Sequence, residues 1–150
     1  MNSAAEFKAE LDTIKAQQQA ILNFNSQVVS DLWKKRYESY LVFWKLTGFL
    51  PKYPRKDTVT YNDLLRKSRE MRDWYFDNGG ILLSDNTKYD YFKLQEEILI
   101  MAPYDSPELI SIKNENGKVD EYEKVRQLFS KVRTGMTKDL NSTQTTLEMY

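Results

Sequence analysis

Residues 71–85 read MRDWYFDNGGILLSD, and this stretch decides how the chain folds. Three aromatic residues at 74–76 precede a pair of glycines, and three aliphatic residues at 81–83 follow it. Residues 78–80 predict the end of a helix, because glycine readily takes the left-handed conformation that a helix end needs. The aliphatic residues are expected to pack beneath the aromatic rings. The stretch is therefore interpreted as a turn between two packed helices.

The alternative interpretation of this stretch is an anion site. Two glycines shortly before a helix N-terminus can leave backbone N–H groups free to bind a phosphate. The P-loop pattern G-x-x-x-x-G-K-[ST] is absent, however. Asp85 also places a negative charge where the phosphate would sit. The turn is therefore the favoured interpretation.

The helix before the turn has a clear start signal. Thr60 and Asp63 form a capping-box pair, and Val59 and Leu64 flank it as a hydrophobic staple. Arg66–Glu70 and Arg69–Asp73 are expected as ion pairs on the exposed face. The expected inward stripe contains Leu64, Leu65, Ser68, Met71, Trp74 and Tyr75.

Two further helices are expected after the turn. Ser84 caps a helix that ends before Pro103, with Tyr91, Leu94, Ile98 and Met101 inward and Phe92 and Leu99 beside them. Residues 105–118 predict a short helix from Ser106 and Pro107 and then a loop, or a hairpin turn at Asn116-Gly117. Residues 119–140 predict a final helix followed by a fraying polar tail. Its inward residues are Tyr122, Val125, Leu128, Phe129, Val132 and Met136.

Upstream of the turn, residues 30–51 predict a helix with a buried face, ended by Gly48 as a C-cap and by Pro51. The face is expected to contain Leu32, Trp33, Tyr37, Tyr40, Leu41 and Trp44. Residues 3–30 predict a helix that can join this one without a break. Its apolar residues alternate by three and four, in a heptad seam of Phe7, Leu11, Ile14, Gln18, Ile21, Asn25, Val28 and Leu32.

Two interpretations of this seam stay open. The helix can lie on its own domain as an amphipathic surface helix. It can instead form a coiled coil with a second copy or another protein, with Gln18 and Asn25 fixing the register. The second interpretation makes Phe7, Leu11, Ile14, Ile21 and Val28 the partner-binding residues.

Composition supports one helical domain. The chain has 150 residues, of which 41% are hydrophobic, enough for a single core. Its 5 glycines and 4 prolines favour long regular elements over a loop-rich β fold. We expect an all-α bundle of four or five helices with a long N-terminal helix able to project. The expected divisions are an amphipathic helix at 1–30, the bundle at 31–141 and a polar tail at 142–150.

The chain lacks both cysteine and histidine. This excludes disulfides, thiolate metal sites and the usual catalytic triads. Asp90, Glu96 and Glu97 are candidate Mg²⁺ ligands, but their spacing on a helix makes them diverge. We therefore expect that the protein is not an enzyme and has no catalytic residue, metal or cofactor. A carboxylate-dependent enzyme is the remaining alternative.

Charge is balanced overall, with 22 basic and 22 acidic residues, so no net field draws the chain to nucleic acid. Residues 31–57 are nevertheless basic, and acids at 81–120 can offset them. The alternative function is binding of nucleic acid or anionic lipid through this segment. Its anion-binding residues would be Lys34, Lys35, Arg36, Lys52, Arg55 and Lys56. No run of 18 apolar residues and no secretory signal is present, so we expect a cytoplasmic protein, with peripheral membrane attachment as the alternative.

Several motifs occur together and resemble a known group. LWKKRYESYLVFWKLTGFLP, LRKSREMRDWYFDNGGILLSDNTKYDYFKLQEEI and LFSKVRTGMTKDL follow one another over roughly residues 30–141. They resemble an uncharacterised bacterial helical family with W-x-L-T, R-x-W-Y-F-x-x-G-G-x-L-L-S, Y-F-x-L-Q and L-R-T-x-L-x-x-D-L motifs. Members often carry a membrane helix before this region, which implies a soluble member or an anchor upstream of residue 1. The resemblance implies no established reaction and assigns no site residues.

Together these patterns predict a non-catalytic protein-interaction or scaffold module. Its partner would be another protein or a second copy, bound through the N-terminal helix by helix-in-groove or coiled-coil association.

Overall fold

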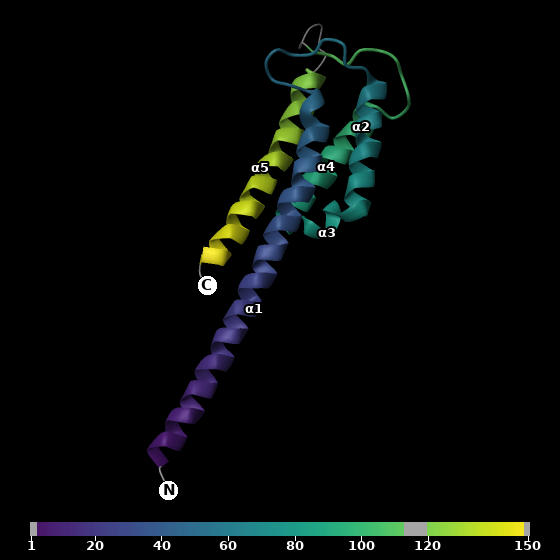
Figure 1. The fold of residues 1–150 in the computed structure, drawn as a ribbon. Helices are drawn as coiled ribbons and strands as arrows, with labels where there is room; N and C mark the ends of the chain where they lie inside the picture. Colours follow the sequence, from purple (N-terminus) through teal and green to yellow (C-terminus); the bar gives the residue numbers. More distant parts are fainter. Residues whose placement is uncertain (1–2, 113–119, 149–150) are drawn as a thin grey trace.

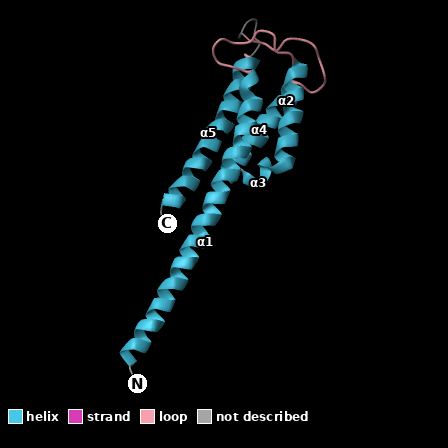
Figure 2. Ribbon diagram, in the orientation of Figure 1, coloured by secondary structure: helices cyan, strands magenta, loops and turns pink. Residues whose placement is uncertain are grey.

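A computed structural model describes residues 3–112 and 120–148, which form an all-α bundle. α1 (Ser3–Leu46), α2 (Tyr61–Trp74), α4 (Asp85–Met101) and α5 (Glu121–Glu148) run alternately up and down, as Figures 1 and 2 show. α1 and α4 each pack against both α2 and α5. The predicted fold class is confirmed, and the N-terminal half of α1 projects far beyond the bundle (Figure 1).

α1 runs through residue 30 without a break, as the continuous pattern allowed. It ends at Leu46, and a 3-10 turn follows at Thr47–Phe49. Gly48 lies inside this turn, and its backbone is not in the left-handed region. The predicted position of the helix end is confirmed, but the predicted C-cap glycine is wrong, because the helix tightens into a 3-10 turn instead.

The bundle covers a strip of α1 that includes the predicted Tyr40 but otherwise differs from the predicted face. The buried residues near its C-terminal end are Ser39, Tyr40, Phe43 and Thr47, which follow one another at helical spacing. Tyr37, Leu41 and Trp44 were predicted to be buried and are exposed. The apolar stripe on this part of α1 is wider than the face that α2 and α5 cover. Trp33 and Leu32 are half-buried.

α2 begins as predicted. The Thr60 side chain accepts a hydrogen bond from the Asp63 backbone N–H at 3.1 Å, and the Asp63 carboxylate accepts one from the Thr60 N–H at 2.9 Å. These bonds satisfy N–H groups that a helix start leaves without a partner. They also lower the pKa of Asp63. Val59 and Leu64, the staple pair, are both buried. The predicted stripe is confirmed, with Leu64, Leu65, Met71 and Trp74 buried and Ser68 and Tyr75 partly buried.

The ion pairs predicted on α2 are wrong. Arg66 binds Asp63 at 2.7 Å, one turn before it, rather than Glu70, one turn after it. Arg69 lies 3.5 Å from Asp105, which belongs to the loop after α4. Exposed arginines have several carboxylates within reach, so spacing along one helix does not fix the partner.

The predicted turn at residues 78–80 is also wrong, because the chain stays helical there. A π-helical segment spans Tyr75–Gly79, and α3 (Gly80–Leu82) continues it. Both glycines have right-handed helical angles. The glycines are needed for space: a Cβ at Gly79 would lie 2.3 Å from the Trp74 indole, and one at Gly80 would lie 2.7 Å from the Tyr75 ring.

The change of direction comes after α3. Leu83 is extended and buried, and Ser84 then caps α4 by accepting a hydrogen bond from the Thr87 N–H. Leu82 is half-buried, whereas Ile81 is 90% exposed and does not pack beneath the aromatic rings. On α4 the inward residues Tyr91, Leu94 and Ile98 are buried and Met101 is partly buried, as predicted, while Phe92 and Leu99 are exposed.

The segment after α4 is extended rather than helical. Ile110 N–H donates to Val59 O at 3.0 Å and Tyr61 N–H donates to Glu108 O at 3.0 Å, around an isolated bridge between Thr60 and Leu109. Pairing with the residues before α2 supplies the backbone partners that a helix would have supplied, so the predicted short helix is wrong. Asn116-Gly117 lies outside the described residues.

α5 provides the central face of the core. The predicted inward residues are confirmed, and the helix continues to Glu148 through the segment predicted to fray. Thr87 of α4 lies so close to Gly135 of α5 that a Cβ on the glycine would be 2.6 Å from its hydroxyl. The fully buried side chains along α5 include Tyr122, Val125, Phe129, Val132 and Met136.

Candidate functional site

The projecting half of α1 carries an exposed apolar seam. All described residues from 3 to 24 are exposed, so this segment does not lie on its own domain, and that interpretation is wrong. Phe7 is 69% exposed and Val28 is 50% exposed. The five predicted partner-binding residues, Phe7, Leu11, Ile14, Ile21 and Val28, are thus all accessible.

Two further apolar residues widen this seam, and neither was predicted to bind a partner. Leu22 and Phe24 lie beside the seam, and Phe24 is 69% exposed. The sequence contains a signal for both residues, because they occupy the positions that flank the apolar core of a heptad repeat. From Asn25 onward several side chains become partly buried while Val28 stays exposed, so the seam reaches the edge of the bundle.

The predicted basic residues do not form one surface. Lys34 and Lys35 are exposed in the C-terminal half of α1, whereas Lys52, Arg55 and Lys56 belong to the loop after it. The α1 residues between these two groups span about 18 Å, at 1.5 Å per residue. Lys52 lies over the Tyr53 ring at 5.4 Å.

Both arginines of that set hold the fold together. Arg36 Nε donates to Leu82 O at 2.8 Å, and its Nη1 donates to Thr143 Oγ1 at 2.7 Å. Arg55 Nη1 donates to Asp120 at 2.9 Å and to Ile112 O at 2.7 Å. Their guanidinium groups are therefore engaged within the protein.

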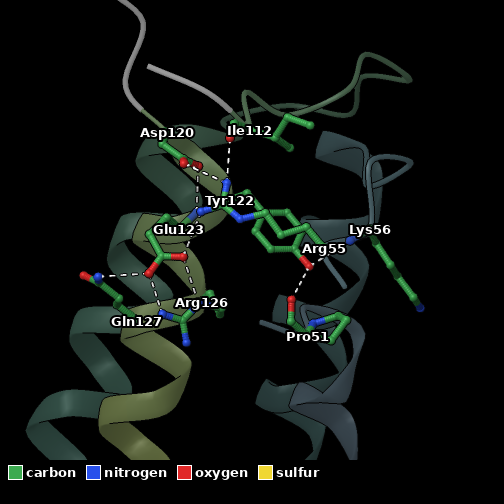
Figure 3. A network of polar contacts seen from close by, with 9 residues as sticks. All are labelled: Pro51, Arg55, Lys56, Ile112, Asp120, Tyr122, Glu123, Arg126 and Gln127. Atoms are coloured by element: carbon green, nitrogen blue, oxygen red, sulfur yellow. Dashed lines mark hydrogen bonds and ion pairs between the residues drawn. The ribbon is translucent and has the colours of Figure 1, made fainter. Parts of the chain in front are cut away.

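The Arg55 contacts belong to a network that fastens the loop to α5 (Figure 3). Glu123 accepts from Arg126 Nε at 2.9 Å and from Arg55 at 3.2 Å. The hydrogen bonds from Arg126 lower the pKa of Glu123 to about 2. Tyr122 O–H donates to Pro51 O at 2.7 Å, while the Lys56 side chain points away from the network (Figure 3). The network stabilises the fold, and its two carboxylates, Asp120 and Glu123, are both paired with arginines.

A buried polar cluster joins α1, α4 and α5. Asp139 accepts a hydrogen bond from Tyr40 O–H at 2.9 Å and from Ser84 N–H at 3.3 Å. Burial, and next the charge of Asp139, raise the pKa of Tyr40. Asp139 thus faces the start of α4, beside the segment where an anion site was considered. A protein carboxylate already occupies this position, which favours the structural interpretation of residues 71–85.

An open groove of about 830 Å³ lies between α2 and α4. Its aromatic wall includes Tyr75, which stacks on Tyr91 with ring centroids 5.0 Å apart. Three of its polar side chains bond one another: Ser68 O–H donates to Gln95 Oε1 at 2.6 Å, and Gln95 Nε2 donates to the Tyr91 hydroxyl oxygen at 3.0 Å. The groove therefore offers mainly apolar surface.

Two of the three acids considered as Mg²⁺ ligands take part in ion pairs instead. Asp90 lies 3.5 Å from Lys131, and Glu97 lies 3.0 Å from Lys124. Glu96 is exposed. Within residues 3–112 and 120–148, no group of three acidic side chains is placed to hold a metal ion.

Comparison with known proteins found no matching family model, curated protein or solved structure. The resemblance to the bacterial helical family therefore stays a prediction. Among the described helices, none is long and apolar enough to cross a membrane.

Proposed function

We propose that this protein is a non-catalytic interaction module that pairs with a second copy of itself through the projecting part of α1. One observation carries the proposal: an apolar seam at residues 7–28 is exposed on a helical segment that leaves its own bundle. Exposed apolar surface of this extent is typical of an interaction site.

The stability of the projecting segment supports pairing. Residues 3–24 extend about 33 Å at 1.5 Å per residue. Few side-chain bonds support this helix from within; one joins Gln19 to Asn23 at 2.9 Å. An isolated helix is marginal in water, and most helical stability in proteins comes from packing an apolar face. Pairing buries that face and stabilises the helix.

The pattern of residues favours a second copy, parallel and in register. In that arrangement Gln18 and Asn25 each meet their own counterparts, as polar residues at core positions of parallel coiled coils do. Glu10 then faces Lys15 of the second copy across the edge of the seam, because these positions are five residues apart and flank the core. An antiparallel pair places no basic residue opposite Glu10.

Light scattering of the whole chain tests the proposal. Wild type is expected to be a dimer, and the Ile14→Ala/Ile21→Ala variant a monomer at the same concentration. Each replacement removes a buried side chain worth about 2–5 kcal/mol in a core, yet alanine favours the helix. Gln19→Ala/Asn23→Ala, on the opposite face, is the matched control and should stay dimeric.

A charge exchange tests the register. Lys15→Glu should weaken the dimer, and Glu10→Lys/Lys15→Glu should restore it. A wild type that remains monomeric at high concentration, or a dimer indifferent to all four seam and charge substitutions, would contradict the proposal. A monomer that captures a different protein through residues 7–28 would reject self-association as well.

A further inference from the structure

A basic hollow lies at the opposite end of α1 from the seam. It has a volume of about 370 Å³ and lies between the end of α1, the loop after it and α5. Among the described residues, three basic side chains line it, Lys52, Arg126 and Arg133, and no acidic one does. Trp44 and Leu50 supply apolar wall.

Arg133 is the central feature of this hollow. Its Nη1 donates to Thr47 Oγ1 at 2.7 Å, and its guanidinium lies 5.6 Å from the Trp44 ring centroid. In the part of the chain that the structure describes, no carboxylate forms an ion pair with it. Burial lowers the pKa of Arg133, and the charge of Arg126 lowers it further.

Described carboxylates compensate the neighbouring arginines, and none of them pairs with Arg133. Glu123 binds both Arg126 and Arg55. A partly buried cation without a counter-charge is unfavourable, because burial removes part of its hydration. A guanidinium carries five N–H donors in a planar fork suited to phosphate, and the bond to Thr47 uses one of them.

We propose that this hollow binds a phosphate monoester of a small organic molecule. Arg133 and Lys52, neither in an ion pair with a described residue, supply two positive charges to a dianionic phosphate. The volume exceeds what a phosphate group alone fills and lies within the range of small-molecule sites. The wall formed by Trp44 and Leu50 contacts the organic part. This site is separate from the seam and does not depend on pairing.

Calorimetric titration of the whole chain with phenyl phosphate tests the site, with inorganic phosphate as the second probe and ionic strength held constant by chloride. Phenyl phosphate should bind more tightly than inorganic phosphate. Arg133→Gln should weaken phenyl phosphate binding at least about tenfold, and Arg133→Lys less. Lys52→Gln, in the exposed loop, should also weaken it without disturbing the fold. Lys138→Gln, on the exposed side of α5, is the control.

Thermal unfolding gives an independent readout. Phenyl phosphate should raise the Tm of wild type, because a ligand that binds the folded state stabilises it. Arg133→Gln should lose this rise in Tm with phenyl phosphate. Heat of binding absent in wild type, or binding unchanged in both Arg133→Gln and Lys52→Gln, would overturn the proposal.

Discussion

The two halves of α1 have similar sequence patterns and different surroundings. Ile14 and Phe43 both belong to apolar stripes at helical spacing, yet Ile14 is exposed and Phe43 is fully buried. The two stripes differ in what packs against them. α2 and α5 flank the C-terminal half of α1, whereas the described bundle stops short of the N-terminal half. An apolar stripe thus predicts a contact surface, and the rest of the fold decides whether that contact is internal.

Truncating one side chain in each half gives the largest expected contrast. Phe43→Ala should lower the free energy of unfolding of the bundle by about 3–5 kcal/mol, because it leaves a cavity among Trp74 and Tyr91. At a concentration where the chain is monomeric, Ile14→Ala should change it by less than about 0.5 kcal/mol. Urea unfolding followed by tryptophan fluorescence measures both, since the tryptophans lie outside the projecting segment. Equal losses would show that residues 3–24 pack on the bundle.

Adding a methyl group tests the close packing inside the bundle. Gly79→Ala should destabilise it by about 1–3 kcal/mol, although alanine normally favours a helix. The Trp74 indole cannot easily withdraw, because its Nε1–H donates to Ser39 O at 2.9 Å. Gly48→Ala is the control, since a Cβ there meets no atom within 4 Å. A neutral Gly79→Ala would contradict the packing described for the π-helical segment.

The bundle and the projecting segment of α1 also differ in what a threonine does. Thr60→Ala should lower the stability of the bundle by about 1 kcal/mol, because it removes the cap of α2. Thr13→Ala removes only a bond to Ala9 O on the exposed helix and should leave bundle stability unchanged. Chemical denaturation of the two variants in parallel provides the measurement. A larger loss from Thr13→Ala than from Thr60→Ala would reverse the expected order.

Lowering the pH should produce the smallest of these effects on the stability of the bundle. The pKa of Glu123 is about 2 in the folded protein, below its ordinary value of 4.5. A depressed pKa gives stability that is complete above the unfolded value and is lost as the pH falls from about 4.5 toward 2. Urea midpoints measured across this window should fall less in Glu123→Gln than in wild type. Ile14→Ala should keep the wild-type slope, and a flat wild-type profile would contradict the role of the Arg126 bonds.

Features that depend on residues close together in the sequence were predicted well. The Thr60–Asp63 cap and the Ser84 cap involve bonds between residues three apart, so the sequence contains both partners. The heptad spacing likewise predicted the seam on α1. Its exposure could not be predicted, because it depends on where α5 lies.

Features that depend on distant contacts were predicted poorly. Gly79 and Gly80 suggested a turn, because the space taken by the Trp74 and Tyr75 rings is not visible in the sequence. The hollow around Arg133 was missed, although Arg126 and Arg133 are seven apart and share a face of α5. What the sequence lacked was the position of the loop after α1, which closes the hollow.

Hydrogen exchange at two protein concentrations tests the central claim most directly. Backbone amides of residues 36–46 should exchange slowly at both concentrations, because the bundle protects them. Amides of residues 7–24 should exchange slowly at high concentration and much faster on dilution, as the paired helices separate. Equal protection of both segments at every concentration would contradict the account, because it would show that the N-terminal half of α1 is held by its own chain.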